Sequence, residues 1–194
     1  MDLKEQVYSV LVVSASEKFN QSLAGLLPQS RFSPVRTVSG VGAARRELLE
    51  RPYDLVLINT PLPDQSGVRL AIDLCGDSGT GVLLFVKSEH YAEVADRVED
   101  YGVLTLQKPT SSGLVAQSLH LLCGTRERLR RMEQKTASIA EKMEEIRLVN
   151  RAKWLLISEL KMTESDAHRY IEKQAMDRCV TRRAVAESII QTYQ

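Results

Sequence analysis

The stretch DLVLINTPLPDQSG, residues 54–67, decides the fold class. It opens with a short apolar run without polar alternation, the pattern of a parallel strand buried on both faces, and continues into a turn rich in proline. Runs of the same kind occur at residues 7–13, 81–86 and 102–106. A weaker candidate, residues 32–38, contains Pro34, and because proline cannot donate to a strand ladder we expect this strand at a sheet edge.

Each expected strand is followed by a stretch of helical character. These stretches cover residues 16–27, 40–50, 67–75, 89–100 and 110–123. Five strand–helix units in succession predict an α/β domain over residues 1–123, built on a doubly wound five-stranded parallel sheet. In such a domain the loops at the carboxyl ends of the strands form the functional site.

The charges are balanced overall but unevenly distributed. The chain has 194 residues with 26 Lys+Arg and 25 Asp+Glu, a net charge of +1, which excludes a polybasic arm and a globally acidic scaffold. Residues 1–123 carry a net charge of −3 and residues 124–194 a net charge of +4, so we expect two parts with different partners.

The cysteines and the apolar runs indicate the compartment. Three widely spaced cysteines offer neither a disulfide framework nor a CxxC metal pair, and this indicates a protein of a reducing compartment. The N-terminus lacks the pattern of a secretory signal, and no apolar run approaches the ~20 residues of a membrane span. We therefore expect a cytoplasmic protein without a membrane partner.

A heptad pattern follows the α/β domain, and residues 124–146 are expected to form a coiled-coil linker helix. Apolar residues recur at a and d positions between charged ones, the pattern of a dimer seam. The seam follows Leu122 and comprises Leu129, Met132, Thr136, Ile139, Met143 and Ile146. We expect a parallel homodimer; the alternative is an amphipathic helix lying on its own domain.

Residues 147–194 are expected to form a three-helix all-α domain. The apolar pattern widens after residue 147, which indicates that the linker helix continues into a small bundle. Thr163, with Asp166 three residues later, predicts the start of a second helix, and Thr181 predicts the start of a third. So few residues bury little surface alone, and packing on a dimeric helix would compensate.

The first domain resembles the receiver domain of two-component response regulators. The resemblance covers residues 7–123 and rests on DLVLINTPLPDQSG and on the pair Lys108-Pro109 after the last strand. In such receivers an aspartate at the end of the third strand accepts a phosphoryl group, and two acidic residues after the first strand hold Mg²⁺. A hydroxyl residue after the fourth strand and a lysine after the fifth complete that site.

The matching positions of this chain lack most of that chemistry. The phosphoacceptor position is Asn59, whose amide cannot be the carboxylate nucleophile, and the acidic pair is replaced by Ser14 and Ala15. Ser88 and Lys108 retain the hydroxyl and the lysine. We therefore predict a pseudo-receiver with no metal, no cofactor and no aspartyl phosphorylation. Lys108 either hydrogen-bonds Asn59 or a strand-end carbonyl, or binds, with helix N-termini, an unknown ligand; an unknown protein partner is a further possibility.

The C-terminal part resembles the ANTAR domain of bacterial transcription antitermination regulators. The resemblance covers about residues 140–190 and rests on RAKWLL, MTESDAHRYIEKQAMD and RRAVAESII, at residues 151–156, 162–177 and 182–190. It implies binding of paired stem-loops in leader transcripts, in competition with a terminator. The implied activity is transcription antitermination, and the protein is not expected to be an enzyme.

Cationic, amide and aromatic side chains of this part are the candidate RNA contacts, because they can meet phosphates and splayed bases. The set is Arg151, Ala152, Lys153, His168, Arg169, Tyr170, Lys173, Gln174, Arg182 and Arg183, with Lys153 the strongest candidate. The competing interpretations are structural. Tyr170 completes a helix core, Ala152 permits close helix packing, Trp154 packs at the linker junction, and the two last arginines are solvated surface.

Two other functions fit the pattern less well. Three short helices also suit a helix–turn–helix, so a DNA-binding transcriptional regulator with a pseudo-receiver domain is the alternative. A helix that only docks a protein partner is a third reading. Binding of hairpin RNA and of duplex DNA at equal salt would separate the first two.

Overall fold

A five-stranded parallel sheet forms the N-terminal part of the computed structural model, which describes residues 6–77 and 79–193. Its strands are β1 (Tyr8–Val13), β2 (Phe32–Val38), β3 (Leu55–Asn59), β4 (Gly81–Lys87) and β5 (Leu104–Lys108), in the order β2-β1-β3-β4-β5. All neighbouring strands are parallel, with Ile58 of β3 paired to Val13 of β1 and Leu84 of β4. The predicted sheet is confirmed, and β2 with Pro34 lies at an edge.

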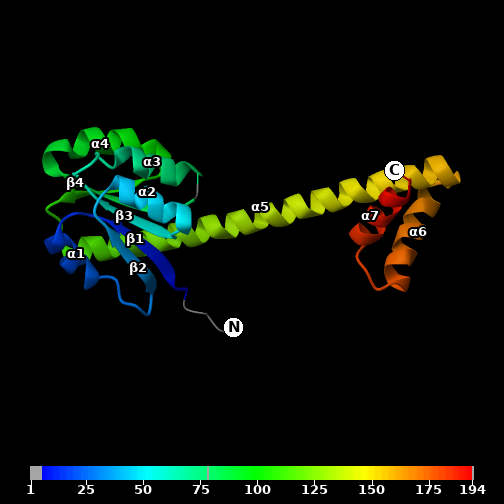
Figure 1. The fold of residues 1–194 in the computed structure, drawn as a ribbon, viewed down its shortest axis with the longest axis horizontal. Helices are drawn as coiled ribbons and strands as arrows, with labels where there is room; N and C mark the ends of the chain where they lie inside the picture. The colour runs from blue at the N-terminus through cyan, green and yellow to red at the C-terminus, as the bar shows by residue number, and fades with distance from the viewer. Residues whose placement is uncertain (1–5, 78, 194) are drawn as a thin grey trace. The chain divides into compact units, whose positions relative to one another are not determined.

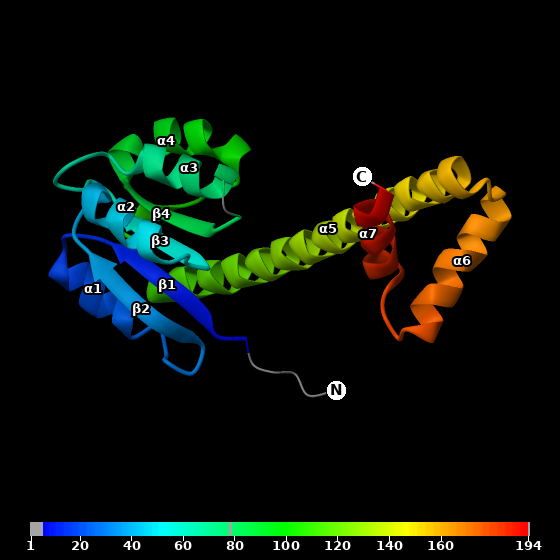
Figure 2. The same ribbon diagram turned by 45° about the vertical axis from the view of Figure 1, so that its right-hand side comes forward.

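Helices cover both faces of this sheet (Figure 1). The helices α2 (Val41–Glu50), α3 (Val68–Asp77) and α4 (Tyr91–Val98) pack on one face, and short 3-10 helices, Ser88–His90 and Glu99–Tyr101, flank α4. The other face is covered by α1 (Glu17–Ala24) and the first turns of α5 (Figure 2). Because both faces are covered, β3 is buried throughout and β4 is buried except at its last residue, as their unalternating sequences predict.

Helix α5 (Ser112–Leu160) is one continuous helix of 49 residues. It contains the last expected helix of the α/β domain, the heptad stretch and the first helix of the C-terminal part. The contacts divide the chain into two units, one ending at Arg131 and one beginning at Met132. This division lies inside α5, as do the boundaries at 123/124 and 146/147 that the sequence suggested, so the helix contributes to both units.

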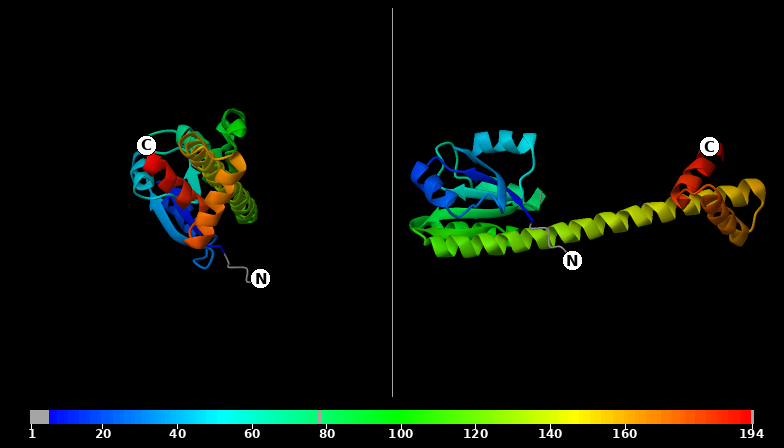
Figure 3. Two further views of the ribbon diagram at one scale, coloured as in Figure 1. Left: turned by 90° about the vertical axis from the view of Figure 1, so that its right-hand side faces the viewer. Right: turned by 90° about the horizontal axis from the view of Figure 1, so that it is seen from below.

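The second unit has its core where the last turns of α5 meet α6 (Glu164–Asp177) and α7 (Arg182–Tyr193), as Figure 3 shows. Ala152, Ala167 and Ala186 are fully buried where the helices approach one another. The longer side chains of this core are Leu156, Ile171, Val185, Ile189 and Ile190. The side chains of Thr163 and Thr181 accept backbone hydrogen bonds at the starts of α6 and α7, as capping residues do.

All three cysteines are unpaired; Cys123 is buried and Cys179 is exposed. Over residues 6–77 and 79–193, none of the helices combines the length and the apolar character that crossing a membrane requires.

Candidate functional sites

The carboxyl ends of three strands bring Ser14, Asn59 and Lys108 together. Lys108 Nζ donates a hydrogen bond to Asn59 Oδ1 over 2.6 Å and a second, short one to the carbonyl oxygen of Thr60. The amide of Asn59 donates to Ser14 Oγ over 3.0 Å, and Ser14 Oγ also accepts from the backbone N–H of Ser16. Ser14 and Asn59 are buried, so this polar chain satisfies groups that would be costly to leave unpaired.

These residues do not fit a divalent cation. The donor set consists of a hydroxyl, an amide oxygen and an ammonium group that already occupies the amide oxygen. Burial, and to a smaller extent the charge of Lys87, lowers the pKa of Lys108. Mg²⁺ prefers charged oxygen ligands, and Ala15 has none to offer. Ser14, Ala15 and Asn59 therefore supply no carboxylate to this site.

Ser88 holds the end of β5 in place. Its hydroxyl donates to the carbonyl oxygen of Lys108 over 2.7 Å. The preceding residue, Lys87, lies 3.5 Å from Glu89 in an exposed ion pair. The hydroxyl that the sequence placed at this site therefore contributes a structural contact between the ends of β4 and β5.

Asp64, in the loop after β3, caps the N-terminus of α2. Its carboxylate accepts from the backbone N–H groups of Val41 and Gly42 over 3.0 and 2.8 Å, and these bonds lower its pKa. A Cβ at Gly40 would lie 2.7 Å from the carboxylate, so the cap needs glycine there. Sequence reasoning missed this contact, because Asp64 and α2 are far apart in the chain.

Two candidate RNA contacts of the second unit, Ala152 and Lys153, contact other helices of that unit. Ala152 is fully buried between helices, so its assignment as an RNA contact is wrong, and the packing interpretation explains it. The side chain of Lys153 is 17% exposed, and its Nζ lies 2.8 Å from Glu164 Oε1 at the start of α6. Lys153 therefore joins α5 to α6, and its role as an RNA contact stays a prediction.

Three further candidates lie on the surface beside carboxylates. His168 Nε2 is 3.3 Å from Glu172, Arg182 is 3.3 Å from Glu145, and Arg183 is 2.9 Å from Glu187. His168 and Arg182 also line a groove of about 430 Å³ together with Lys142, Asn150 and Lys153. Exposed ion pairs are weak, so a phosphate can compete for Arg182 and Arg183.

Arg151, Arg169 and Lys173 are the exposed cations of the candidate set that remain unpaired. Within residues 6–77 and 79–193, none of the three lies in an ion pair with a carboxylate. Arg169 and Lys173 are one turn apart on α6, on a face that points away from the buried Ile171. This pair is the part of the set best suited to phosphate contacts.

Tyr170 is partly packed and partly exposed. Its side chain is 38% exposed, and it lines a small hollow of about 150 Å³ together with Gln174, Arg178, Ser188 and Thr192. One part of the ring therefore packs against the bundle and another part faces solvent, where an aromatic ring can stack on a base.

Most residues of the expected seam are exposed on α5. Met132, Ile139, Met143 and Ile146 have exposed fractions between 56% and 66%, and Thr136 is also exposed. Leu129 is half-buried. Leu122 lies in the core under the sheet, so the heptad position assigned to it belongs to the first unit.

Trp154 is an exposed aromatic that the sequence reading placed in a packed junction. Its side chain is 73% exposed, on the side of α5 away from the buried Ala152 and Leu156. Elsewhere in this unit, Met176 is 74% exposed at the end of α6. No cluster of three His, Cys, Asp or Glu side chains that could hold a metal ion occurs among residues 6–77 and 79–193.

The C-terminal part matches the model of the ANTAR domain over residues 137–190. Along nearly its whole length the chain is similar to the transcriptional regulatory protein PdtaR of Mycobacterium tuberculosis, strains CDC 1551 and H37Rv. The identity is 28% over 185 residues, which cover 94% of this chain and 89% of that protein.

The first unit is similar in fold to solved receiver domains. A receiver domain of an HD domain-containing protein from Pseudomonas fluorescens Pf-5 matches with a TM-score of 0.59 and 19% identity, over 68% of this chain and 96% of that one. The receiver domain of the response regulator TorR matches with a TM-score of 0.53 and 20% identity, over 61% and 98%. A sensor protein from Polaromonas sp. JS666 matches with a TM-score of 0.51 and 24% identity, over 61% of this chain and 98% of that one.

Proposed function

We propose that this chain, in which a receiver fold precedes a C-terminal ANTAR domain, is an RNA-binding regulator of transcription antitermination. It binds paired stem-loops in leader transcripts as a homodimer in the cytoplasm, and aspartyl phosphorylation does not control it. The observation that carries the proposal is the ANTAR match over residues 137–190, which lies inside the second structural unit.

The surface of that unit supports an RNA ligand. Arg169 and Lys173 present two unpaired cations on one face of α6, and Arg151 presents another on α5. Tyr170 and Gln174 supply a partly exposed ring and an amide on a neighbouring face of α6. Cations for the backbone beside aromatic and amide groups for loop bases are the combination that sequence-specific RNA recognition uses.

Dimerisation is supported by the apolar residues exposed on α5. Met132, Ile139, Met143 and Ile146 follow a heptad spacing and are covered by no other part of the described chain. A second copy of the same helix would bury them in a coiled-coil seam. A dimer carries two ANTAR domains, so binding of one hairpin makes binding of a linked second hairpin intramolecular, and modest single-site affinities suffice.

The receiver unit supports constitutive activity. The Lys108–Asn59 hydrogen bond involves the residue that the resemblance to receivers assigns as the phosphoacceptor position, and Ser14, Ala15 and Asn59 carry no carboxylate. No phosphoryl signal is then available to trigger assembly of the dimer.

The test is a binding titration of the purified, untreated protein with two-hairpin RNA, single-hairpin RNA and duplex DNA at equal salt, with the mass measured by light scattering. Tight binding of the two-hairpin RNA by a dimer supports the proposal, and a preference for duplex DNA favours the alternative of a DNA-binding regulator. A chain that binds neither nucleic acid contradicts both functions.

A further inference from the structure

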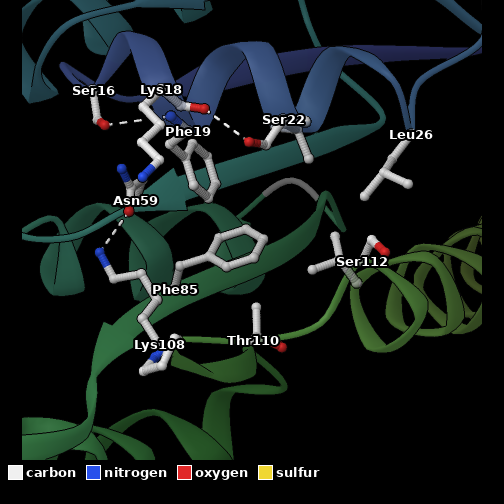
Figure 4. A pocket seen from close by; sticks show the side chains of 13 residues that line it. Ser16, Lys18, Phe19, Ser22, Leu26, Asn59, Phe85, Lys108, Thr110 and Ser112 are labelled. Carbon is white, nitrogen blue, oxygen red and sulfur yellow. Dashed lines mark hydrogen bonds between the residues drawn. The ribbon is translucent and has the colours of Figure 1, made fainter.

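The first unit contains a cavity of about 600 Å³ between α1, the carboxyl ends of β3 to β5 and the start of α5. Its size lies in the range of small-molecule sites, about 300–1,000 Å³. Figure 4 shows its side chains: Phe19 from α1, Leu26 from the turn after α1, Phe85 from β4, and Asn59 and Lys108 at one end.

The body of this cavity is apolar and aromatic. The rings of Phe19 and Phe85 meet edge to face with their centroids 4.9 Å apart, and Leu23, Leu26 and Val115 complete the wall. Phe85 is fully buried and Phe19 is half-buried, so the edge-to-face pair reaches from the sheet core to the cavity wall. A flat apolar or aromatic group placed there would be removed from water, which is the main source of affinity in such sites.

One end of the cavity is cationic. Lys18 from α1 and Lys108 from β5 extend toward Asn59 from opposite sides (Figure 4). No carboxylate is among the described residues that line the cavity. Lys108 uses two of its three N–H donors on Asn59 and Thr60, so one donor remains for a ligand.

This end of the cavity is therefore positively charged, whereas a site for a cation needs negative charge. The side chain that both lysines approach is the neutral amide of Asn59, which accepts a hydrogen bond from Lys108 (Figure 4). Burial, and to a smaller extent the charge of Lys87, lowers the pKa of Lys108, whereas an anion bound beside the ammonium group would favour its charged form.

We propose that this cavity binds a small amphipathic anion, with a carboxylate-type or phosphate-type group beside Lys18 and Lys108 and an apolar or aromatic body against Phe19 and Leu26. The head group forms charge-assisted hydrogen bonds with the two lysines. This inference does not depend on the RNA-binding function, and its test involves no RNA.

The test is isothermal titration of the full chain with naphthalene-2-carboxylate, with the uncharged 2-naphthylmethanol and with acetate as matched probes. We expect saturable binding of the naphthoate, with one molecule per chain. The neutral analogue should bind at least about tenfold more weakly, the effect of losing one hydrogen bond to a charged group. Acetate, which lacks the apolar body, should bind more weakly than the naphthoate.

Two exposed positions on α1 supply variants that leave the fold intact. Lys18→Met keeps the apolar stem and removes the charge, and should weaken the naphthoate about tenfold without affecting the neutral analogue. Ser22→Trp places an indole over the cavity and should prevent binding of both aromatic probes. The control is Lys135→Met, an exposed lysine on α5 that does not line the cavity.

Amide chemical shifts provide a second readout on the unmodified chain. Addition of naphthoate should shift the amide signals of Phe19, Phe85 and Lys108 and leave those of α6 and α7 unchanged. The proposal is overturned if the naphthoate does not bind saturably, if the neutral analogue binds equally well, or if Lys18→Met and Ser22→Trp bind like the wild type.

Discussion

Lys108 Nζ and Asn59 Oδ1 lie 2.6 Å apart, and this hydrogen bond joins the end of β5 to the end of β3 at the edge of the sheet. The lysine donates to a neutral amide oxygen. Asn59 in turn donates a hydrogen bond to Ser14 after β1, so side chains link the ends of three strands.

Asn59→Asp alone should not create a phosphorylation site. The substitution restores a carboxylate beside Lys108, but Ser14 and Ala15 still provide no charged ligand for Mg²⁺. After incubation with acetyl phosphate and Mg²⁺, intact-mass spectrometry should show no added phosphoryl group on the wild type or on the variant. Phosphoryl transfer to the wild-type chain would contradict the pseudo-receiver assignment.

The Lys153–Glu164 ion pair should make the stability of the second unit depend on acid pH. The hydrogen bond from Lys153 lowers the pKa of Glu164 below the ordinary 4.5. A carboxyl group whose pKa is lowered by folding stabilises the fold above its unfolded pKa, and this contribution disappears as the pH falls through the folded pKa. The melting temperature of the wild type should exceed that of Glu164→Gln at pH 7, and the two should converge below pH 4.5.

The control for this pH dependence is the Lys153→Met background. In it the Glu164→Gln substitution should change the melting temperature little at any pH, because the partner of the carboxylate is gone. A difference between wild type and Glu164→Gln that is as large at pH 3 as at pH 7 would show that the ion pair is not its cause.

Ile171→Ala should destabilise the second unit by about 2–5 kcal/mol, the range for removing a large buried aliphatic side chain. Ile171 is 1% exposed and packs on the buried faces of α5 and α7. Hydrogen exchange of the α6 and α7 amides measures the loss. Arg169→Ala, two residues away on the exposed face, should change it by less than about 0.5 kcal/mol.

Arg169→Ala and Lys173→Ala should instead weaken RNA binding. Each removes one phosphate contact, so each should lower the slope of log K against log salt by about 0.7–0.9. The binding isotherms are measured with two-hairpin RNA at several salt concentrations. The matched control is Arg97→Ala, which changes an exposed arginine on α4. An equal change in the slope for that variant would show that α6 does not contact the RNA.

Ile139→Glu with Met143→Glu should convert the proposed dimer to a monomer. Both side chains are exposed on the heptad face of α5, where opposed carboxylates would meet in a coiled coil. Light scattering measures the mass, and circular dichroism checks that the helix persists. Gln134→Glu with Ser138→Glu adds the same charge on the opposite face and should remain dimeric; if the seam variant also remains dimeric, the interface lies elsewhere.

Much of the fold was readable in the sequence because its signals are local. The apolar run before Asn59 and the proline in β2 identify a central and an edge strand from neighbouring residues alone. Thr163 marks the start of α6, since a capping side chain bonds to a backbone group only three residues later. The motifs of the ANTAR domain are likewise short and contiguous.

By itself, then, the sequence determined the sheet, its edge strand and the ANTAR domain, because residue type and spacing within a few positions are sufficient for each. Only the tertiary structure decided that Leu122 belongs to the sheet core, that Lys153 pairs with Glu164 and that Asp64 caps α2. A heptad count records which residues are apolar, but not which neighbour covers them. Whether a cation is free or paired depends on a carboxylate that only folding brings within hydrogen-bond distance.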